Sequence, residues 1–505
     1  MSAISVPAAA SILSLVLVAT ALPAQTSVSD PSSSGMSKVR IVRLSEVRGE
    51  VQVDRGTGRG FEAAMQNLPI VESSHVRTGV GVAEIEFEDN STLRLAPDTE
   101  VEFPMLERRA SGATVTAARV LRGTVYASLI KTRTANNDFT LLFGPEKLPL
   151  QPDSHIRLEM NPTGARLAVL DGMVEVNGAD GPTAVPRKRT ITFAFAPNSQ
   201  PEVSEVKKEV ASNSLDSWDK QSADYHARVA TMAAVGNAPY SYGLNDMNYY
   251  GSFTDQGGCG MMWRPYFTSA AWEPYANGTW AWYPGAGYSW VSPYPWGWTP
   301  YHYGSWSYCP GTGWGWMPGG VWNGLANVPG TTGTTFGTVG HFPHRPTEPP
   351  RVGQSTLVSV NLKPLISSEV SGQDSFLFRR DSAGLGIPRE GLGGLRGFSE
   401  NALRHGTAST PVYLTVASGA GTFSGAGRTT VSGLAPVAVH RGYAPAPAMP
   451  TGSGFSANSS SLSSQGASST QSIISPGPVS SGGGIGGGHG GGAAPVGGGG
   501  GGHGH

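Results

Sequence analysis

The chain has 505 residues, of which 70 are glycine and 38 are proline, and its 35 Lys and Arg residues nearly balance its 36 Asp and Glu residues. This length allows two or three domains, but the glycines and prolines gather in particular zones, so we expect much of the chain not to be packed. The balanced charge gives no broad positive field that would gather the phosphates of a nucleic acid. Nucleic-acid binding is therefore disfavoured.

The N-terminal segment has the pattern of a secretory signal. An apolar run, Ile12–Leu22, leads into the small-residue sequence LPA, which ends at residue 24. This pattern predicts a signal peptide over 1–24 and export to the periplasm or the cell surface. The segment before the run has no Lys or Arg, and the run could instead stay uncleaved as an anchor. No later run approaches the roughly 20 apolar residues of a membrane helix, so we expect no stable transmembrane span after signal removal.

Residues 39–178 read as strand after strand. The stretch AEIEFED (83–89) alternates apolar Ile85 and Phe87 with glutamates, which predicts one apolar and one solvated face. Asp89-Asn90-Ser91 supplies a turn, and Leu93 with Leu95 begins a returning strand. The sequence therefore predicts an antiparallel all-β domain. The alternating glutamates are Glu84, Glu86 and Glu88, and the same period recurs at Val51/Val53, Val125/Ala127/Leu129, Ile156/Leu158/Met160, Leu167/Val169 and Val174/Val176.

Three segments of this domain carry a family resemblance. RTGVGVAEIEFEDNSTLRLAPDTEV (77–101), followed by LRGTVYASL (121–129) and VLDGMVEVNG (169–178), resembles the FecR-type periplasmic domain of iron-dicitrate sensor proteins. In signalling members of that family a cytoplasmic segment precedes a membrane helix and contacts a sigma factor. Here only about ten residues precede the apolar run, so the resemblance implies a stand-alone, exported copy of the domain. It implies the β fold and no particular activity.

A linker over 179–236 is predicted to contain one short amphipathic helix, which we expect to pack on a neighbouring domain. Gly236 ends the helical pattern. The residues at helical spacing are Leu215, Trp218, Ser222, Tyr225, Val229 and Met232.

The segment 237–322 is rich in Trp and Tyr and repeats itself. Eleven of the twelve tryptophans lie between residues 263 and 322. In each of three copies, a Gly-x-aromatic sequence is followed ten residues later by a Trp, and the better copies carry PGAG or PGTG turns between the two aromatics. The pattern predicts three stacked β-hairpins that form a small sheet. The three pairs are Phe253 with Trp263, Trp280 with Trp290, and Trp306 with Trp316.

Two interpretations of these rings remain open. They can be the core of the small sheet, since large rings bury much area per residue. Alternatively, strand alternation exposes about half of them as a contact surface. An uncharged, ring-lined surface would suit a glycan or cell-wall polymer, or the β edge of an envelope protein. The candidate ligand-binding residues are Trp272, Tyr275, Trp280, Trp290, Trp298, Tyr301, Trp306 and Trp316.

The arrangement of the aromatic segment also resembles an uncharacterised tryptophan-rich module that commonly follows FecR-like domains in exported bacterial proteins. NDMNYYGSF and PWGWTPYHYGSW carry this resemblance, which covers about 240–320 and brings no activity with it. The two cysteines of the chain, Cys259 and Cys309, both lie in this segment. An even pair in an exported protein predicts a disulfide, which would stabilise by about 4 kcal/mol in the chain-entropy model. Two unpaired thiols are the alternative.

The region 323–505 is predicted to be of low complexity and largely disordered. Residues 442–505 contain no Asp, Glu, Lys or Arg, so they cannot bury enough surface to offset chain entropy. The more basic stretch 376–406 either docks on a partner or an anionic envelope surface, or is a solvated linker. The tail histidines lack the preformed geometry of a metal site, and we expect no metal there. They are His489, His503 and His505.

No motif of a nucleophile elbow, a metalloprotease or a phosphate-binding loop occurs, and we predict neither a catalytic residue nor a cofactor. His302, Asp246 and Glu273 are the nearest acid or base groups in the repeats, but His302 and Glu273 vary between the copies. The sequence thus favours a non-enzymatic, exported envelope protein that acts as a binding or assembly module. The alternatives are an envelope sensing or signal-relay component and, third, an enzyme that acts on envelope polysaccharide.

Overall fold

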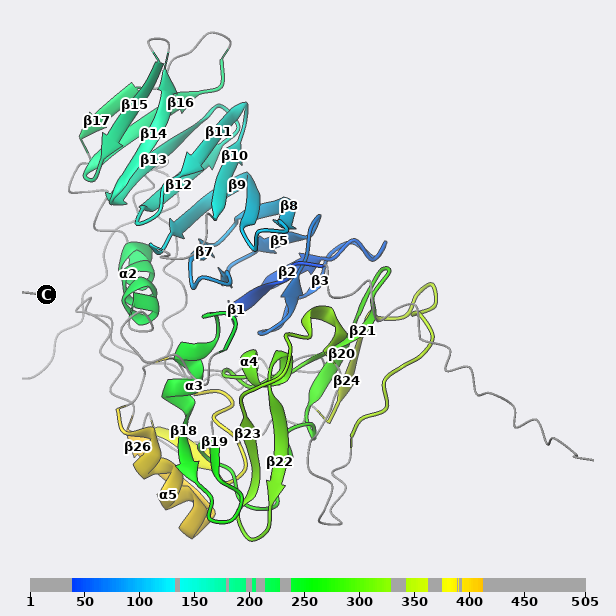
Figure 1. Cartoon of the computed structure of the whole chain (residues 1–505). Helices are drawn as coiled ribbons and strands as arrows, with labels where there is room; N and C mark the ends of the chain where they lie inside the picture. Colours follow the sequence, from blue (N-terminus) through cyan, green and yellow to red (C-terminus); the bar gives the residue numbers. More distant parts are fainter. Residues whose placement is uncertain are drawn as a thin grey trace, which may run out of the picture. The chain divides into compact units, whose positions relative to one another are not determined.

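The computed structural model describes residues 39–131, 137–178, 181–196, 202–205, 214–227, 238–327, 342–361, 375–387, 389 and 393–411. The signal peptide predicted over 1–24 and the C-terminal histidines lie outside the described residues, as does the segment 412–505 of the predicted disordered region. The described part of the chain is mainly β, as the apolar alternation predicts (Figure 1).

The N-terminal β domain is built from strands β1 to β17. The hairpin predicted from AEIEFED forms between β6 and β7, where Ile85 faces Leu93 across the strands. The strands continue past the predicted end at residue 178, because β16 pairs with β13 and β17 pairs with β16. Their bounds are β1 (Val42–Arg48), β2 (Val51–Asp54), β3 (Glu62–Ala63), β4 (Pro69–Ile70), β5 (His75–Thr78), β6 (Val82–Glu86), β7 (Thr92–Leu95), β8 (Glu100–Arg108), β9 (Thr114–Ser128), β10 (Asp138–Phe143), β11 (Glu146–Leu150), β12 (His155–Asn161), β13 (Gly164–Asp171), β14 (Met173–Gly178), β15 (Gly181–Pro186), β16 (Arg189–Ala194) and β17 (Glu202–Glu205).

The long strand β9 joins two sets of strands. Its first part pairs with β8 and, in parallel, with β10, whereas its last part pairs with β7 and β12. Gly123 stands where the partners change and has a φ of +90°. A Cβ atom there would overlap Thr99, so only glycine fits this bend.

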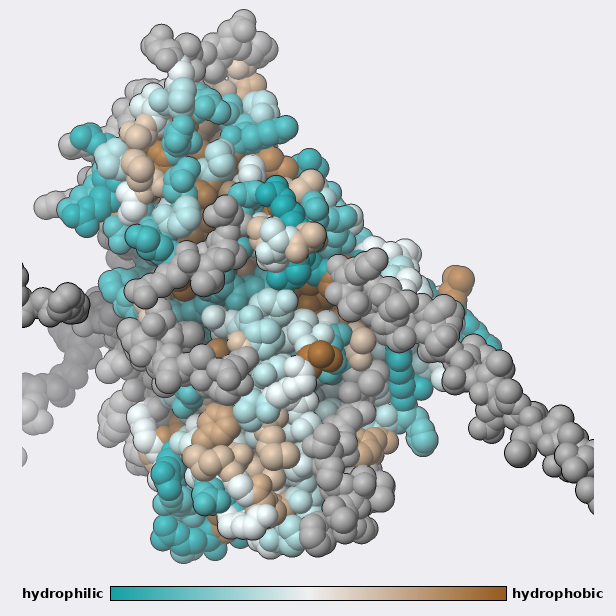
Figure 2. Space-filling view, viewed as in Figure 1, coloured by the Kyte–Doolittle hydropathy of each residue, from teal (hydrophilic) through white to brown (hydrophobic). Residues whose placement is uncertain are grey.

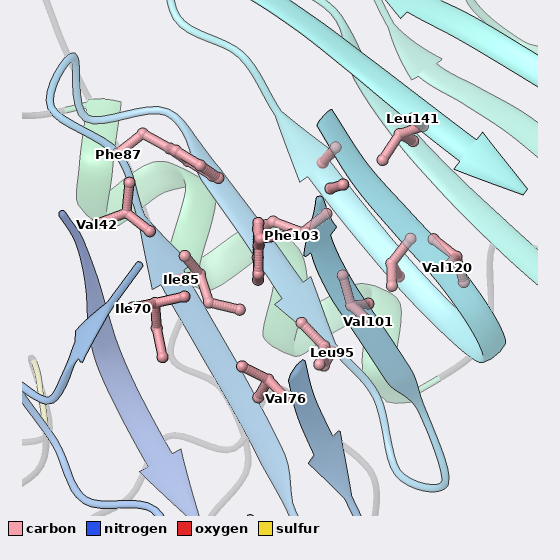
Figure 3. Close-up of a cluster of buried hydrophobic side chains, with 14 of the residues drawn as sticks. Val42, Ile70, Val76, Ile85, Phe87, Leu95, Val101, Phe103, Val120 and Leu141 are labelled. Atoms are coloured by element: carbon pink, nitrogen blue, oxygen red, sulfur yellow. The ribbon is translucent and has the colours of Figure 1, made fainter. Parts of the chain in front are cut away.

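Apolar side chains from both sets of strands form the core of the β domain. Figure 3 shows them pointing toward one another from β1, β4 to β10 and the loop after β6. All are buried, which confirms the predicted apolar face of the strands. The labelled residues are Val42, Ile70, Val76, Ile85, Phe87, Leu95, Val101, Phe103, Val120 and Leu141.

The linker contains the predicted helix, α2 (Ser214–Ala227), whose apolar residues Leu215 and Tyr225 are buried. The prediction of a single short helix was incomplete. Three more helices occur among the described residues, because turns rich in Gly and Pro bound segments too short for a visible helical period. They are α3 (Leu244–Tyr250), α4 (Thr299–His302) and α5 (Leu395–His405), and a 3₁₀ turn η4 spans Gly324–Ala326.

The aromatic module contains the three predicted hairpins. In each, the two aromatics that are ten residues apart are direct cross-strand partners, as Trp280 and Trp290 are in the second hairpin. The hairpins do not stack into the single sheet that we expected. The first and third join through Trp263 and Trp316, and the second pairs instead with β24. The strands are β18 (Gly251–Asp255), β19 (Met261–Pro265), β20 (Gly278–Tyr283), β21 (Gly287–Val291), β22 (Ser305–Cys309), β23 (Gly313–Met317) and β24 (Leu357–Val360).

A glycine lies beneath a tryptophan ring in each hairpin. Gly251, Gly278 and Gly304 begin the three Gly-x-aromatic sequences, and a Cβ atom at any of them would overlap the second Trp of its own hairpin. The missing side chain leaves room for an indole to lie on the backbone of the facing strand, a known device for stabilising glycines in sheets. This contact explains why the repeat requires glycine and tryptophan at fixed spacing.

The aromatic module is held together by a disulfide and by segments that follow the module in the sequence. Cys259 and Cys309 are joined, linking the turn of the first hairpin to β22 of the third. The described residues of the stretch 376–406 are not a solvated linker. Instead β25 (Ser375–Arg379), α5 and β26 (Thr407–Pro411) pack against the aromatic core, with Phe267 stacked on Phe378 and the main-chain N–H of Phe267 bonded to Ser399.

Gly278→Ala should lower the free energy of unfolding by about 1–3 kcal/mol, because the new methyl group must displace the Trp290 ring. Urea unfolding followed by tryptophan fluorescence measures this loss. Gly397→Ala is the matched control, since nothing lies within 4 Å of the position of its added Cβ atom in α5. Equal effects of the two substitutions would contradict the proposed role of Gly278.

Candidate functional site

The structure places the eight candidate ligand-binding rings in the interior. None exposes more than 4% of its surface, so a sugar cannot stack on any of them in this conformation. The hypothesis that they form a ligand surface is therefore wrong for this structure, and the alternative interpretation as a core fits. The eight are Trp272, Tyr275, Trp280, Trp290, Trp298, Tyr301, Trp306 and Trp316.

The rings are hidden because segments outside the repeats cover the faces that alternation would expose. Trp296 donates its indole N–H to the carbonyl of Ala383, and the ring of Phe342 packs 5.4 Å from that of Tyr275. Both partners come from the region that was predicted to be disordered. On the face drawn in Figure 2, hydrophobic residues are interspersed with hydrophilic ones rather than gathered into one strip.

His302, the most plausible acid or base in the sequence, is a structural residue. It is 2% exposed, and its ring lies 4.2 Å from that of Trp298 and stacks on that of Trp322. Its Nδ1 donates to the carbonyl of Gly324 at 3.0 Å. Burial lowers the pKa of His302 to about 3, despite the opposing effect of this hydrogen bond. The imidazole is therefore uncharged at neutral pH and unable to exchange protons with a substrate.

The polar face of β6 is the main surprise of the structure. We expected Glu84, Glu86 and Glu88 to be solvated, but all three are buried. Each meets an arginine: Arg94 bonds Glu84 at 2.9 Å, Arg43 bonds Glu86 at 2.9 Å, and Arg40 bonds Glu88 through two nitrogens at 2.8 Å. Burial of these carboxylates is tolerable because the arginines neutralise them.

Arg43 connects this face to the aromatic module. Its side chain is fully buried on β1 and bonds Asp246 of α3 at 2.7 Å and the carbonyl of Pro295 at 2.6 Å. It also donates to Asn67, whose own amide bonds the carbonyls of Ser292 and Tyr294. One arginine and one asparagine thus satisfy polar groups of both modules at their contact.

Helix α2 covers the same polar face. Asp219 bonds Arg94 at 2.8 Å and Asp216 bonds Arg157 at 2.6 Å. At the end of the helix, the two ring nitrogens of His226 lie 2.8 Å from Asn90 Oδ1 and 3.0 Å from Glu84 Oε1. The amide nitrogen of Asn90 donates to the carbonyl of His226, so its oxygen faces the ring.

Asp246 and Glu84 are the acidic centres of this buried network. Burial by itself raises the pKa of Glu84, but the charges of His226, Arg389 and Arg94 lower it well below its usual value. Burial likewise opposes ionisation of Asp246, and Arg389 and Arg43 lower its pKa. Both groups stay ionised near neutral pH. Their stabilising contribution is present above the usual carboxylate pKa and is lost as the pH falls through the lowered one.

These groups are held in place by hydrogen bonds and ion pairs with one another. Apolar alternation alone did not predict that these charges are buried. The sequence does place opposite charges at facing positions of neighbouring strands, a pattern that could have predicted the ion pairs. Arg43 is the register partner of Glu86, and Glu84 is that of Arg94. Glu273, the remaining acid considered, lies partly exposed between β19 and β20.

Within the described ranges, no group of three or more His, Cys, Asp or Glu side chains could hold a metal ion. None of the helices in the part of the chain that the structure describes is long and apolar enough to cross a membrane.

Comparisons with known proteins find one family match and one weak structural likeness. Residues 244–348 match the model of DUF6600, a family of unknown function. Two crystal structures of a proposed anti-sigma factor from Parabacteroides distasonis, at 1.65 and 2.50 Å resolution, are each 10% identical over 28% of this chain, with a TM-score of 0.23. The chain spans 63% of the length of those structures, and a likeness this weak assigns no function. No curated protein matches the chain.

The stability of the protein should rise between about pH 3 and pH 6.5, partly through His302. Below pH 6.5 the unfolded state binds a proton at this residue, whereas the folded state does not until about pH 3. The free energy of unfolding therefore gains roughly 1.4 kcal/mol per pH unit from this group. His302→Phe should remove that slope in urea titrations at several pH values, and exposed His344→Asn should leave it. An unchanged slope in His302→Phe would contradict the assignment.

Asp246→Asn should lower the free energy of unfolding at neutral pH by about 3–5 kcal/mol, because it leaves Arg43 and Arg389 buried and short of an anion. The difference from wild type should shrink as the pH falls below the ordinary carboxylate pKa of about 4 and on through the lowered pKa of Asp246, because the unfolded state takes up the proton first and the folded state follows. Asp224→Asn, at an exposed position of α2, is the control and should change little. Chemical unfolding of the three proteins makes the comparison, and a loss as small as that of the control would count against the network.

Proposed function

We propose that this chain is a non-enzymatic, exported protein of the cell envelope that acts as an assembly module for a protein partner. The observation that carries the proposal is the buried network through Arg43 and Asp246, which fixes the β domain against the aromatic module. A fixed contact between two modules offers a partner one preorganised surface, which lowers the entropy cost of binding. The acids and the histidine considered for catalysis are committed to internal contacts, with Glu273 the exception.

A protein partner is favoured over a glycan. Recognition of a neutral polysaccharide by this module would need exposed ring faces, and the eight candidate rings are buried. The indole N–H groups of Trp263, Trp306 and Trp316 are also occupied, since each donates to a main-chain carbonyl of the module.

Export is supported by two features that are far apart in the sequence. The N-terminal segment has the pattern of a signal peptide. The disulfide between Cys259 and Cys309 suits an oxidising compartment, because cytosolic proteins rarely keep such bonds.

Photo-crosslinking in cells tests the proposal. A photoreactive residue replaces an exposed apolar residue of either module, Met261 and Val321 in the aromatic module and Val80 and Met173 in the β domain. The full chain, with its own N-terminal segment, is expressed, the cells are fractionated and the cross-linked products are identified by mass spectrometry. Purified chain is tested in parallel for retention on peptidoglycan and for release of soluble sugar from it.

An assembly module should give exported protein, one defined cross-linked partner from at least one position, and neither retention nor sugar release. Cross-linking to a single membrane protein through the β domain alone would favour the alternative of envelope sensing, which the FecR-type resemblance suggests. Retention on peptidoglycan or release of sugar would contradict the proposal, as would chain that stays in the cytoplasm.

A further inference from the structure

Arg389 enters the buried network from outside both modules. It follows the aromatic module by more than sixty residues, yet its side chain is only 14% exposed and contacts residues of β1, β6, α2 and α3. The segment around it is also held elsewhere, since Tyr250 donates its hydroxyl to the carbonyl of Ile387 at 2.6 Å.

The contacts of Arg389 use the planar fork of the guanidinium group. Its Nε and Nη2 bond the two oxygens of Asp246 at 3.0 and 3.1 Å, and its Nη1 bonds Glu84 at 2.7 Å. Nη2 also donates to the carbonyl of Ser45 at 3.0 Å, and the charge lies 5.3 Å from the centre of the Tyr225 ring. A lysine ammonium cannot reproduce the paired bonds to one carboxylate together with those to the other two acceptors.

The walls of this site are held in place without Arg389. Glu84 accepts bonds from Arg94 at 2.9 Å and from the Ser45 hydroxyl at 2.7 Å. Asp246 accepts bonds from Arg43 at 2.7 Å and from the Tyr225 hydroxyl at 2.7 Å. The acceptors therefore keep their positions through other partners, and the site is preorganised for its occupant.

Charge gives the site its affinity. Four buried carboxylates, Glu84, Glu86, Asp219 and Asp246, face only Arg43 and Arg94 among the other arginines of the network. His226 lies 3.0 Å from Glu84, and His155 lies 2.6 Å from Asp219. Arg389 places its guanidinium beside Glu84 and Asp246 and pairs with both carboxylates.

We propose that Ser45, Glu84, Tyr225 and Asp246 form a guanidinium-binding socket, which the chain fills with its own Arg389 and which accepts a free guanidinium compound when that side chain is removed. The socket ties the C-terminal segment to both modules at one point. Its existence is independent of the proposed envelope role.

The test uses full-length Arg389→Ala with ethylguanidinium, which matches the end of an arginine side chain, and ethylammonium as the control compound. Millimolar ethylguanidinium should raise the Tm of Arg389→Ala along a saturable curve and should leave wild type unchanged. Arg404→Ala, which removes an exposed arginine of α5, should not respond. Asp246→Asn in the Arg389→Ala background should abolish the rise.

Ethylammonium that raises the Tm of Arg389→Ala as much as ethylguanidinium would overturn the proposal, as would a rise of the same size in wild type or no saturable rise at all. If Arg389→Ala does not fold alone, its refolding yield from urea is measured with each compound. Recovery with ethylguanidinium and not with ethylammonium supports the socket, and equal or absent recovery refutes it. Arg389→Lys should melt below wild type, since the ammonium cannot form the fork.

Discussion

A carboxylate that leaves water must meet a positive charge, and the contact between the two modules of this protein depends on that requirement. The glutamates of β6 point away from the apolar core of the β domain into a second buried layer. Arg43 and Arg94 neutralise this layer from the neighbouring strands, and Asp246 enters it from the aromatic module. Breaking such a buried pair is costly even where forming it gains little, so the network specifies how the modules meet.

Segments that follow the aromatic repeats in the chain complete the sheet and the core of the aromatic module. The second hairpin lacks a partner among the other two and takes β24 as its third strand. The aromatic core receives Phe378 and Leu395 from the segment that forms β25, α5 and β26. These additions cover the ring faces that a three-hairpin sheet would expose, which is why a module so rich in tryptophan has its candidate rings inside.

Apolar alternation in the sequence predicts individual strands and hairpins well. It does not predict which distant segments pack on them. The β6–β7 hairpin, helix α2 and the three cross-strand aromatic pairs follow from period and turn chemistry, which are local properties. The burial of Glu84 depends instead on α2 and Arg389, which lie 130 and 305 residues away along the chain. The prediction of disorder was also wrong for the described residues of 375–411, although their sequence is of low complexity. A few apolar residues are enough to fold such a segment when they pack into an aromatic core that the rest of the chain provides.

The buried charge network should make the two modules unfold together. Eleven of the twelve tryptophans lie in the aromatic module, so their fluorescence reports its unfolding. Hydrogen–deuterium exchange of the amides in strands β10 to β16 reports the β domain. We predict that a urea titration gives coincident transitions by the two probes. Amides of the β domain that remain protected after the fluorescence transition is complete would contradict the claim.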